Sequence, residues 1–151
     1  WLTARGFHAE ARPASHDIDW KTISSPFPHK MAATLSGLGW IGKCDLLVTP
    51  CYGSAVRFAS VLTDAPLKTG TPETVSRCGD CHACVDVCPG KACSGRNWTS
   101  GGRREDIWDP RKCMEGMAAI NKRLGVDTHI CGMCIAACPH TKAYVRRANA
   151  A

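Results

Sequence analysis

The stretch CGDCHACVDVCPGKAC, residues 78–93, places five cysteines within sixteen residues. The whole chain has 151 residues and eleven cysteines. Two interpretations compete: a disulfide scaffold of the kind found in small secreted proteins, or a set of thiolates that bind metal. Secreted disulfide proteins are usually shorter and have an even number of cysteines, so the spacing has to decide between the two.

The spacing of these cysteines favours iron–sulfur ligation. Residues 78–89 follow the pattern C-x2-C-x2-C-x3-C-P, which in bacterial ferredoxins wraps a four-iron cluster. A shorter run, C-x2-C-x3-C-P, follows at residues 131–139, and Cys113 lies between the two runs. C-x2-C pairs also suit a zinc ribbon. A triple run that ends in Cys-Pro is not typical of zinc sites, so the sequence predicts iron–sulfur clusters.

The number of cysteines predicts two [4Fe-4S] clusters. In two-cluster ferredoxins the fourth cysteine of a run binds the other cluster, because the chain leaves the first three cysteines on a short helix. The same crossover here uses eight of the eleven cysteines. We expect a first ligand set of Cys78, Cys81, Cys84 and Cys138, and a second ligand set of Cys88, Cys113, Cys131 and Cys134.

Three cysteines remain outside these two sets. Cys44, Cys51 and Cys93 are expected to be small, buried, apolar residues. Cys93 lies just beyond the first run, where a further ligand is redundant. Cys44 follows a glycine-rich loop and is the strongest candidate among them for another role.

The rest of the sequence predicts an α+β fold in two parts. Residues 1–70 read as part of an α/β domain with a β-hairpin, and residues 71–151 read as a ferredoxin-like helical domain that binds both clusters. Short elements are expected first: a strand near 8–13, a helix at 30–35 and a tight loop at 36–43. The hairpin should join a strand at 45–49 to a strand at 54–64, with Val56, Phe58 and Leu62 on one face.

Two helices are expected in the second part. The first begins after the cap residue Asp109 and ends at Gly125. Its buried stripe should consist of Met114, Met117, Ala118 and Leu124. The second is a basic helix over residues 140–151 that frays at its end.

The formal net charge is +6. Two bound clusters of roughly −2 each would reduce it to about +2. The basic excess therefore either offsets cluster charge or forms a face for polyanions such as nucleic acid. Arg103, Arg104, Arg146 and Arg147 are candidates for phosphate contacts, and a solvated charged face is the alternative.

The sequence shows neither a bilayer-spanning apolar run nor a signal segment. It therefore predicts a cytoplasmic protein with no membrane partner. The chain begins with Trp1, and we expect that an N-terminal part is missing.

A longer pattern resembles one known family. The stretch SGLGWIGKCDLLVTPCYGSAVRFASVLTDAPL, residues 36–67, precedes the first cysteine run, and CGMCIAACPHTKAY contains the second. The glycine loop, the aromatic-Gly-Ser segment and the order of the eight cysteines are similar to those of the epoxyqueuosine reductase family, which is related to reductive dehalogenases. The resemblance covers residues 30–144.

The resemblance implies a cobalamin-dependent reductase. Two [4Fe-4S] clusters would feed electrons to a base-off corrinoid, which removes oxygen from a tRNA nucleoside, and ferredoxin or flavodoxin would supply the electrons. Glycines allow close approach to a flat macrocycle, although a plain tight turn is the alternative. The residues that match the family's loop beside the corrinoid are Gly37, Leu38, Gly39, Trp40, Gly42 and Lys43.

One position departs from the family pattern. The family has a V-D-S-x-P segment whose aspartate resembles a general acid, and this chain has Thr22-Ile23-Ser24-Ser25-Pro26 instead. Ile23 cannot deliver a proton, while Asp17 and Asp19 are shifted along the chain. His29, His82 and His129 are alternative proton carriers or surface residues.

Three functions stay open at this stage. The first is a corrinoid-linked reductase, the second is an electron-transfer module without an organic cofactor, and the third is a tRNA-modifying epoxyqueuosine reductase. The isoleucine at position 23 argues against the third.

Overall fold

A computed structural model describes residues 1–128 and 130–150, and it confirms the α+β class. His129 lies outside the described residues. The elements in chain order are η1 (Thr3–Arg5), β1 (Ala9–Arg12), α1 (His29–Leu35), β2 (Trp40–Ile41), β3 (Leu47–Val48), β4 (Ser60–Thr63), α2 (Ala83–Asp86), α3 (Arg104–Ile107), α4 (Pro110–Leu124), α5 (Met133–Ala137) and α6 (Pro139–Asn149).

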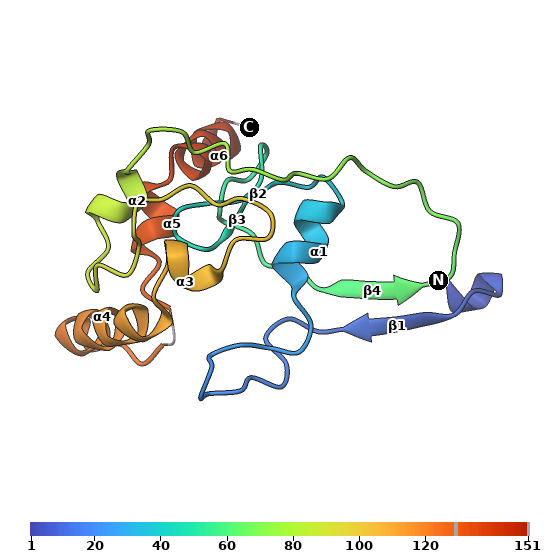
Figure 1. Ribbon diagram of the computed structural model, residues 1–151, viewed down its shortest axis with the longest axis horizontal. Coiled ribbons are helices and arrows are strands. Elements are labelled where there is room, and N and C mark those ends of the chain that lie inside the picture. Colours follow the sequence, from blue (N-terminus) through green and yellow to red (C-terminus); the bar gives the residue numbers. More distant parts are fainter. Residues whose placement is uncertain (129, 151) are drawn as a thin grey trace.

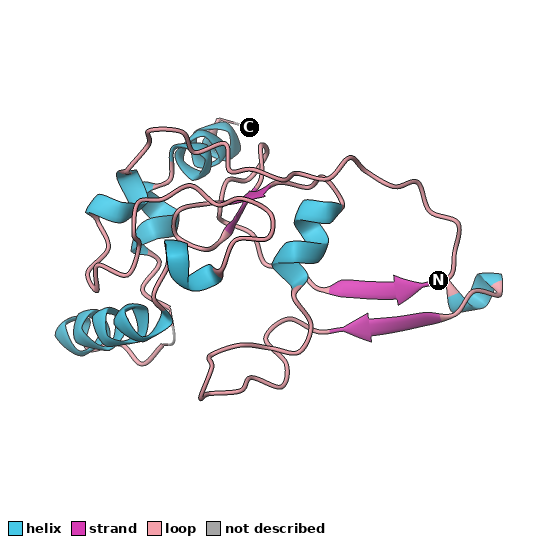
Figure 2. Ribbon diagram, in the orientation of Figure 1, coloured by secondary structure: helices cyan, strands magenta, loops and turns pink. Residues whose placement is uncertain are grey.

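The strands form two separate antiparallel ribbons (Figure 2). In the β1–β4 ribbon Ala9 lies opposite Thr63, although the two strands are far apart in the sequence. In the β2–β3 ribbon Trp40 lies opposite Val48. The β1–β4 ribbon extends away from the helices, and β2–β3 lies among them (Figure 1).

The β-hairpin exists, but not where the sequence predicts it. Strand β2 falls inside the expected loop at 36–43 and pairs with β3, so the hairpin connection is residues 42–46. The segment after Gly53 does not continue as a strand, because Gly53 and Ser54 dock against Thr141 at the start of α6. The Ser54 amide donates to Thr141 Oγ1 at 3.1 Å. Only the end of the expected second strand forms β4, which leaves Leu62 exposed rather than buried.

Helix α4 has the predicted ends but not the predicted buried face. The Asp109 side chain accepts hydrogen bonds from the amides of Arg111 and Lys112, and Gly125 ends the helix in a left-handed conformation. The expected stripe is wrong, since Met114, Ala118 and Leu124 are exposed and only Met117 is partly buried. The helix packs instead through Gly116, where an added Cβ would lie 2.3 Å from the Gly90 amide nitrogen. A side chain at this position would block the contact.

The cysteine-bearing helices lie next to each other. Helix α2 carries Cys84 and α5 carries Cys134, and the two helices pack against each other. Helix α6 continues from α5 after Cys138 and confirms the expected C-terminal helix. Figure 1 shows α2, α5 and α6 grouped at the opposite end of the molecule from the β1–β4 ribbon, with α1 between them.

Two apolar clusters hold the chain together. The first core contains Ala33, Ile41, Leu47, Trp98 and Ile107. The second core contains Trp40, Val48 and Cys138, with Cys78 packed against it. Both cores join residues from the two sides of the expected boundary at residue 70. The β2–β3 ribbon contributes to both, because Trp40 and Ile41 point to opposite faces of their strand.

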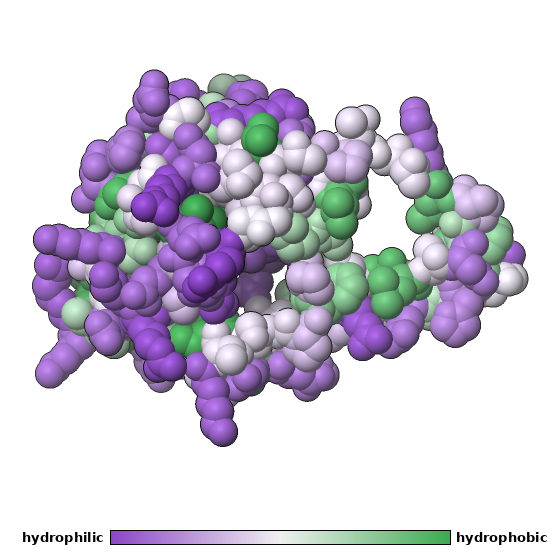
Figure 3. Space-filling view, in the orientation of Figure 1, coloured by the Kyte–Doolittle hydropathy of each residue, from purple (hydrophilic) through white to green (hydrophobic). Residues whose placement is uncertain are grey.

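The surface differs between the two ends of the molecule. In Figure 3, apolar patches cover part of the β1–β4 ribbon, and an opening separates this ribbon from the segment that follows β4. Val61 and Leu62 of β4 are among the exposed large apolar residues. Among the helices of the described residues, none is long and apolar enough to cross a membrane.

Candidate functional site

The glycine loop packs against the protein's own backbone. An added Cβ at Gly39 would lie 2.1 Å from the Val48 carbonyl oxygen, and one at Gly37 would lie 2.5 Å from the Thr71 carbonyl oxygen. Gly37 also has a φ of +72°, a conformation that strains other residues. These glycines therefore allow close chain packing. Leu38 is exposed, whereas Trp40 and Lys43 are each only 2% exposed.

The second core brings together two members of the first ligand set. Cys78 and Cys138, sixty residues apart, both pack with Trp40. The indole Nε1 of Trp40 donates a hydrogen bond to Cys78 Sγ at 3.4 Å. Cys81 is exposed and Cys84 is partly buried.

The second ligand set gathers around Cys113. Burial raises the pKa of the Cys113 thiol to about 11, and the neighbouring thiols of Cys131, Cys134 and Cys88 add to this effect. A hydrogen bond from the Trp108 side chain acts in the opposite direction. The other three members of this set therefore all act on the Cys113 thiol.

Cys44 and Cys93 are buried beside the predicted ligands. Hydrogen bonds to the thiols of Cys134 and Cys84, together with burial, raise the pKa of Cys44. Its hydrogen bond to Cys84, aided by one from Cys93, lowers the pKa of Cys84 to about 3. Cys44 therefore touches one member of each ligand set. Cys51 is exposed, so the expectation of a buried position is wrong for this residue alone.

A positive charge lies near one predicted ligand sulfur, and a backbone amide donates to another. The buried Lys43 ammonium helps to lower the pKa of Cys84 by charge attraction. The Ala92 amide donates to Cys88 Sγ at 3.3 Å. Donors and cations of this kind stabilise thiolates that carry a negatively charged cluster.

All eleven cysteines are free thiols, so the disulfide scaffold does not form. Among the residues that the structure describes, no three His, Cys, Asp or Glu side chains are grouped as ligands of a single metal ion. A four-iron cluster binds each cysteine at a different iron, so its ligand sulfurs surround the cluster rather than meet at one point. The chemistry of the donor set, thiolates with N–H donors and a buried cation, fits such a group.

A cavity of about 670 Å³ lies on the other side of the β2–β3 ribbon. This volume falls within the range of about 300–1,000 Å³ that is common for small-molecule sites. Its walls are mainly apolar and come from the loop 14–28, α1, Ile41, Phe58 and the segment around Trp108. None of the six loop residues expected to bind a cofactor is among those that line this cavity. The nearby residues Ile41 and Asp45 line it instead.

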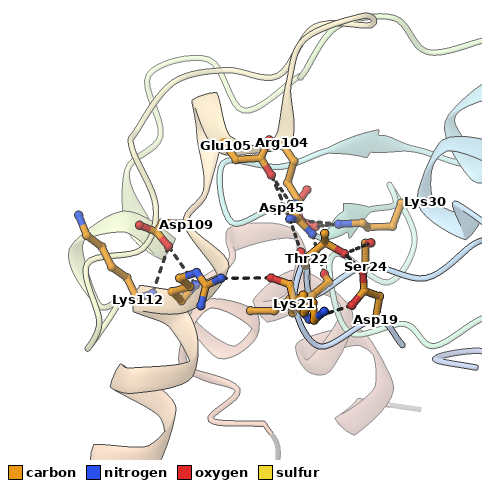
Figure 4. A network of polar contacts seen from close by, with 12 residues as sticks. Asp19, Lys21, Thr22, Ser24, Lys30, Asp45, Arg104, Glu105, Asp109 and Lys112 are labelled. Atoms are coloured by element: carbon orange, nitrogen blue, oxygen red, sulfur yellow. Dashed lines mark hydrogen bonds and ion pairs between the residues drawn. The ribbon is translucent and has the colours of Figure 1, made fainter. Parts of the chain in front are cut away.

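The buried carboxylate of the cavity is Asp45. Burial raises the pKa of Asp45, and the charge of Lys30 opposes this effect. Lys30 Nζ lies 2.5 Å from Asp45 Oδ2 and 2.6 Å from the Asp45 carbonyl oxygen. Figure 4 shows this pair next to a polar network that links the loop around Thr22 to α3 and α4.

Ile23 lies in the cavity wall in a strained conformation. Its φ is +51°, which is rare for a β-branched residue and much more common for Asn or Asp. Arg104 fixes this backbone, because its guanidinium donates to the Ile23 carbonyl at 2.7 Å and to the Thr22 carbonyl at 2.9 Å. Asp19 accepts hydrogen bonds from Lys21 and Thr22, which lower its pKa. Asp19 therefore stabilises the loop on the N-terminal side of Ile23.

Asp45 and Lys30 were not predicted from the sequence. The acidic residue two positions after Lys43 was a usable signal, but nothing marked its partner on α1. Among the predicted histidines, His29 lines the cavity and its Nδ1 lies 2.8 Å from Ser60 Oγ. His82 is the N-cap residue of α2. Arg147 is engaged by the Cys51 carbonyl oxygen, so this arginine is not a free phosphate ligand.

Comparisons with known proteins connect this arrangement to one family. No family model matches the chain. An epoxyqueuosine reductase from Synechococcus sp. (strain CC9605) is 31% identical over 143 residues, which cover 87% of this chain and 40% of that protein.

Solved structures show the same fold. An epoxyqueuosine reductase with a tRNA-Tyr epoxyqueuosine-modified stem loop matches with a TM-score of 0.67 and 20% identity, covering 95% of this chain and 36% of its own. An epoxyqueuosine reductase from Bacillus subtilis, whose catalytic loop with an aspartate is swung out of the active site, matches with a TM-score of 0.62 and 20% identity over 91% and 33% of the chains.

The chain spans about two fifths of the length of the curated relatives that match most of it, 40% and 41% for two of them. The match extends over most of this chain. On this basis the chain belongs to an epoxyqueuosine reductase-like family.

Proposed function

We propose that this chain is the cluster-binding part of an oxidoreductase that passes single electrons through two [4Fe-4S] clusters to an acceptor in the cavity. The observation that carries the proposal is the packing of Cys78 and Cys138, sixty residues apart, against Trp40. The crossover expected of a two-cluster protein pairs the first run with the last cysteine of the second run, and this contact supports it. The charges of the Cys88, Cys131 and Cys134 thiols, which help to raise the pKa of Cys113, add support for the second set. Relatives named as reductases support the same reading.

The protein's own residues would supply what two clusters require. When bound, each cluster accepts and releases one electron. The eight cysteines of the two ligand sets would hold them as thiolates. Lys43 offsets negative charge near Cys84, and the Ala92 amide donates to Cys88. Cys44 lies between the sets, beside Cys134 and Cys84, and its single S–H is a donor for one of these two sulfurs at a time.

We propose a corrinoid as the acceptor, as the family resemblance implies. The apolar cavity beside the β2–β3 ribbon supports an organic ligand of some size. Contact between a corrinoid and the loop residues Gly37 to Lys43 stays a prediction. The glycines meet protein backbone, so contact through Ile41 and Asp45 is the arrangement that the cavity favours.

Asp45 is the proposed proton donor of the cavity. Burial raises its pKa, which favours the protonated form that an acid catalyst needs. Lys30 holds the residue in place, because it donates one hydrogen bond to the Asp45 carboxylate and one to the Asp45 backbone carbonyl. Ile23 occupies the position of the family's acid and offers no proton, so the acid function would move across the cavity.

Iron and sulfide analysis tests the clusters. The protein is purified without oxygen, and we expect about eight irons and eight sulfides per chain. Cys113→Ser should lose about half of the iron, because it removes one ligand of the second set. Cys51→Ser is the matched control, since Cys51 is exposed and outside both sets. Four irons in the unmodified protein would contradict the proposal.

Cobalamin binding separates the first two functions. Cob(II)alamin is added to the anaerobic full-length gene product, and a base-off signal is sought by absorption and electron paramagnetic resonance. Such a signal supports the corrinoid-linked reductase. An intact eight-iron protein that binds no cobalamin would instead be an electron-transfer module without an organic cofactor.

The tRNA-modifying reading is the second candidate. One structural relative was solved with a tRNA stem loop, and the net charge of +6 is compatible with a nucleic-acid partner. A gel-shift assay with tRNA at increasing salt tests it, because phosphate contacts weaken steeply with salt. We further propose a cytoplasmic location, where thiols stay reduced, and ferredoxin or flavodoxin as the electron donor.

A further inference from the structure

Trp40 places its only polar atom on a predicted cluster ligand. The side chain is 2% exposed, so its N–H has no access to bulk water. Nε1 donates to Cys78 Sγ at 3.4 Å, within the longer distance expected for sulfur acceptors. A buried indole N–H normally needs a partner. Here that partner is a thiol of the first ligand set.

Residues from the two cysteine-bearing segments that join at Trp40 pack against its ring. The Arg77 guanidinium lies 5.6 Å from the ring centroid, and Arg77 directly precedes Cys78. The His140 ring meets the indole edge to face at 5.1 Å and follows Cys138 by two residues. Because these neighbours hold the ring, the N–H has little freedom to leave the sulfur.

We propose that Trp40 is a positioning residue that sets the reduction potential of the cluster held by the first ligand set, through its indole N–H···S hydrogen bond to Cys78. The inference rests on the proposed function, since it requires that cluster. Reduction adds one electron and makes the ligand sulfur more negative. An N–H donor stabilises the reduced state more than the oxidised state and raises the potential. No proton leaves the indole in this step.

The test uses Trp40→Phe, which keeps an aromatic ring and removes the donor. Each anaerobic protein is titrated with dithionite and followed by electron paramagnetic resonance. We expect about eight irons in the variant. Trp40→Phe should make the midpoint potential of one cluster more negative and leave the other unchanged. Trp98→Phe is the control, because Trp98 is buried in the first core and should move neither potential.

The outcomes separate this inference from the proposed function. Fewer than about eight irons in the unmodified protein overturns the proposed function. About eight irons together with unchanged potentials in Trp40→Phe overturns the inference alone. An equal shift in Trp98→Phe also overturns it, because the effect would then not require the N–H donor to Cys78.

A second measurement covers a variant that fails to fold. Biosynthetic replacement of tryptophan by benzothienylalanine exchanges the N–H for sulfur and keeps the bicyclic shape. The potential of one cluster should become more negative in the substituted protein. Assembled clusters with unchanged potentials would show that the indole donor has no part in setting them.

Discussion

The two antiparallel ribbons of this chain have the same pairing but opposite environments. All four residues of β2–β3 are buried, whereas most residues of β1–β4 are exposed. An isolated two-stranded ribbon is marginally stable in water. The stability of β2–β3 must therefore come from its neighbours: the first core on one face, and Cys78 and Cys138 on the other. The comparison suggests that the cysteine segments and this ribbon depend on each other.

The largest loss of stability should follow from a substitution that disrupts the close contact between Gly39 and strand β3. Gly39→Ala would place a Cβ 2.1 Å from the Val48 carbonyl oxygen, so β2 has to move. We expect a loss of about 4 kcal/mol or more in the free energy of unfolding. Urea unfolding under argon, followed by circular dichroism, measures it.

Gly101→Ala is the control for this substitution. Gly101 also lies in a loop, and an added Cβ there meets nothing within 4 Å, so only its φ of +83° opposes alanine. The expected loss is about 1 kcal/mol. Equal losses at Gly39 and Gly101 would mean that the β2–β3 contact is not the source of stability.

Matched leucines compare the two ribbons directly. Leu47 of β3 is 3% exposed and Leu62 of β4 is 41% exposed. Leu47→Ala should lower the free energy of unfolding by about 2–5 kcal/mol, because it leaves a cavity in the first core. Leu62→Ala should cost less than about 1 kcal/mol. The same urea experiment checks both, and a larger loss at Leu62 would contradict the contrast.

Local patterns in this sequence predict the ends of elements better than they predict packing. The Asp109 cap and Gly125 at the ends of α4 are local signals, and the structure confirms both. Cysteine spacing is also a local signal, and the ligand sets drawn from it stay a prediction. The pairing of β1 with β4 joins residues 48 to 54 positions apart, and no local pattern marks it. The predicted partner of β3 was wrong for the same reason. Because Gly53 docks on α6, the chain that follows it does not continue as the expected second strand.

Asp45, in the hairpin connection between β2 and β3, makes the stability of the fold depend on pH. Burial raises the pKa of Asp45 above its usual 3.8. Below 3.8 the carboxyl is protonated in both the folded and the unfolded chain, and the fold bears no charge penalty. As the pH rises from 3.8 through the raised pKa, the unfolded chain releases this proton before the folded chain does, so the free energy of unfolding falls.

Asp45→Asn should remove this dependence. Its stability relative to the unmodified protein is expected to increase as the pH rises from 3.8 through the raised pKa, and then to level off. Lys30 partly offsets the burial penalty and so limits the total change. Urea unfolding under argon at pH values from about 3 to about 8, in steps of about half a pH unit, measures the difference. A difference that decreases with pH would refute this account of Asp45.

The smallest effect concerns the loop that faces the ribbon across the cavity. Ile18 and Ile23 both line this cavity, but only Ile23 has a positive φ. Asparagine adopts that conformation more readily, so Ile23→Asn recovers about 1 kcal/mol of backbone strain that Ile18→Asn cannot recover. Both variants lose a similar apolar contact. Ile23→Asn should therefore be the more stable of the two in urea unfolding. Equal stability of the two variants would mean that the Ile23 backbone is not strained. The hydrogen bonds from Arg104 to the Thr22 and Ile23 carbonyls would then hold this conformation, and the cavity wall would tolerate the isoleucine for that reason.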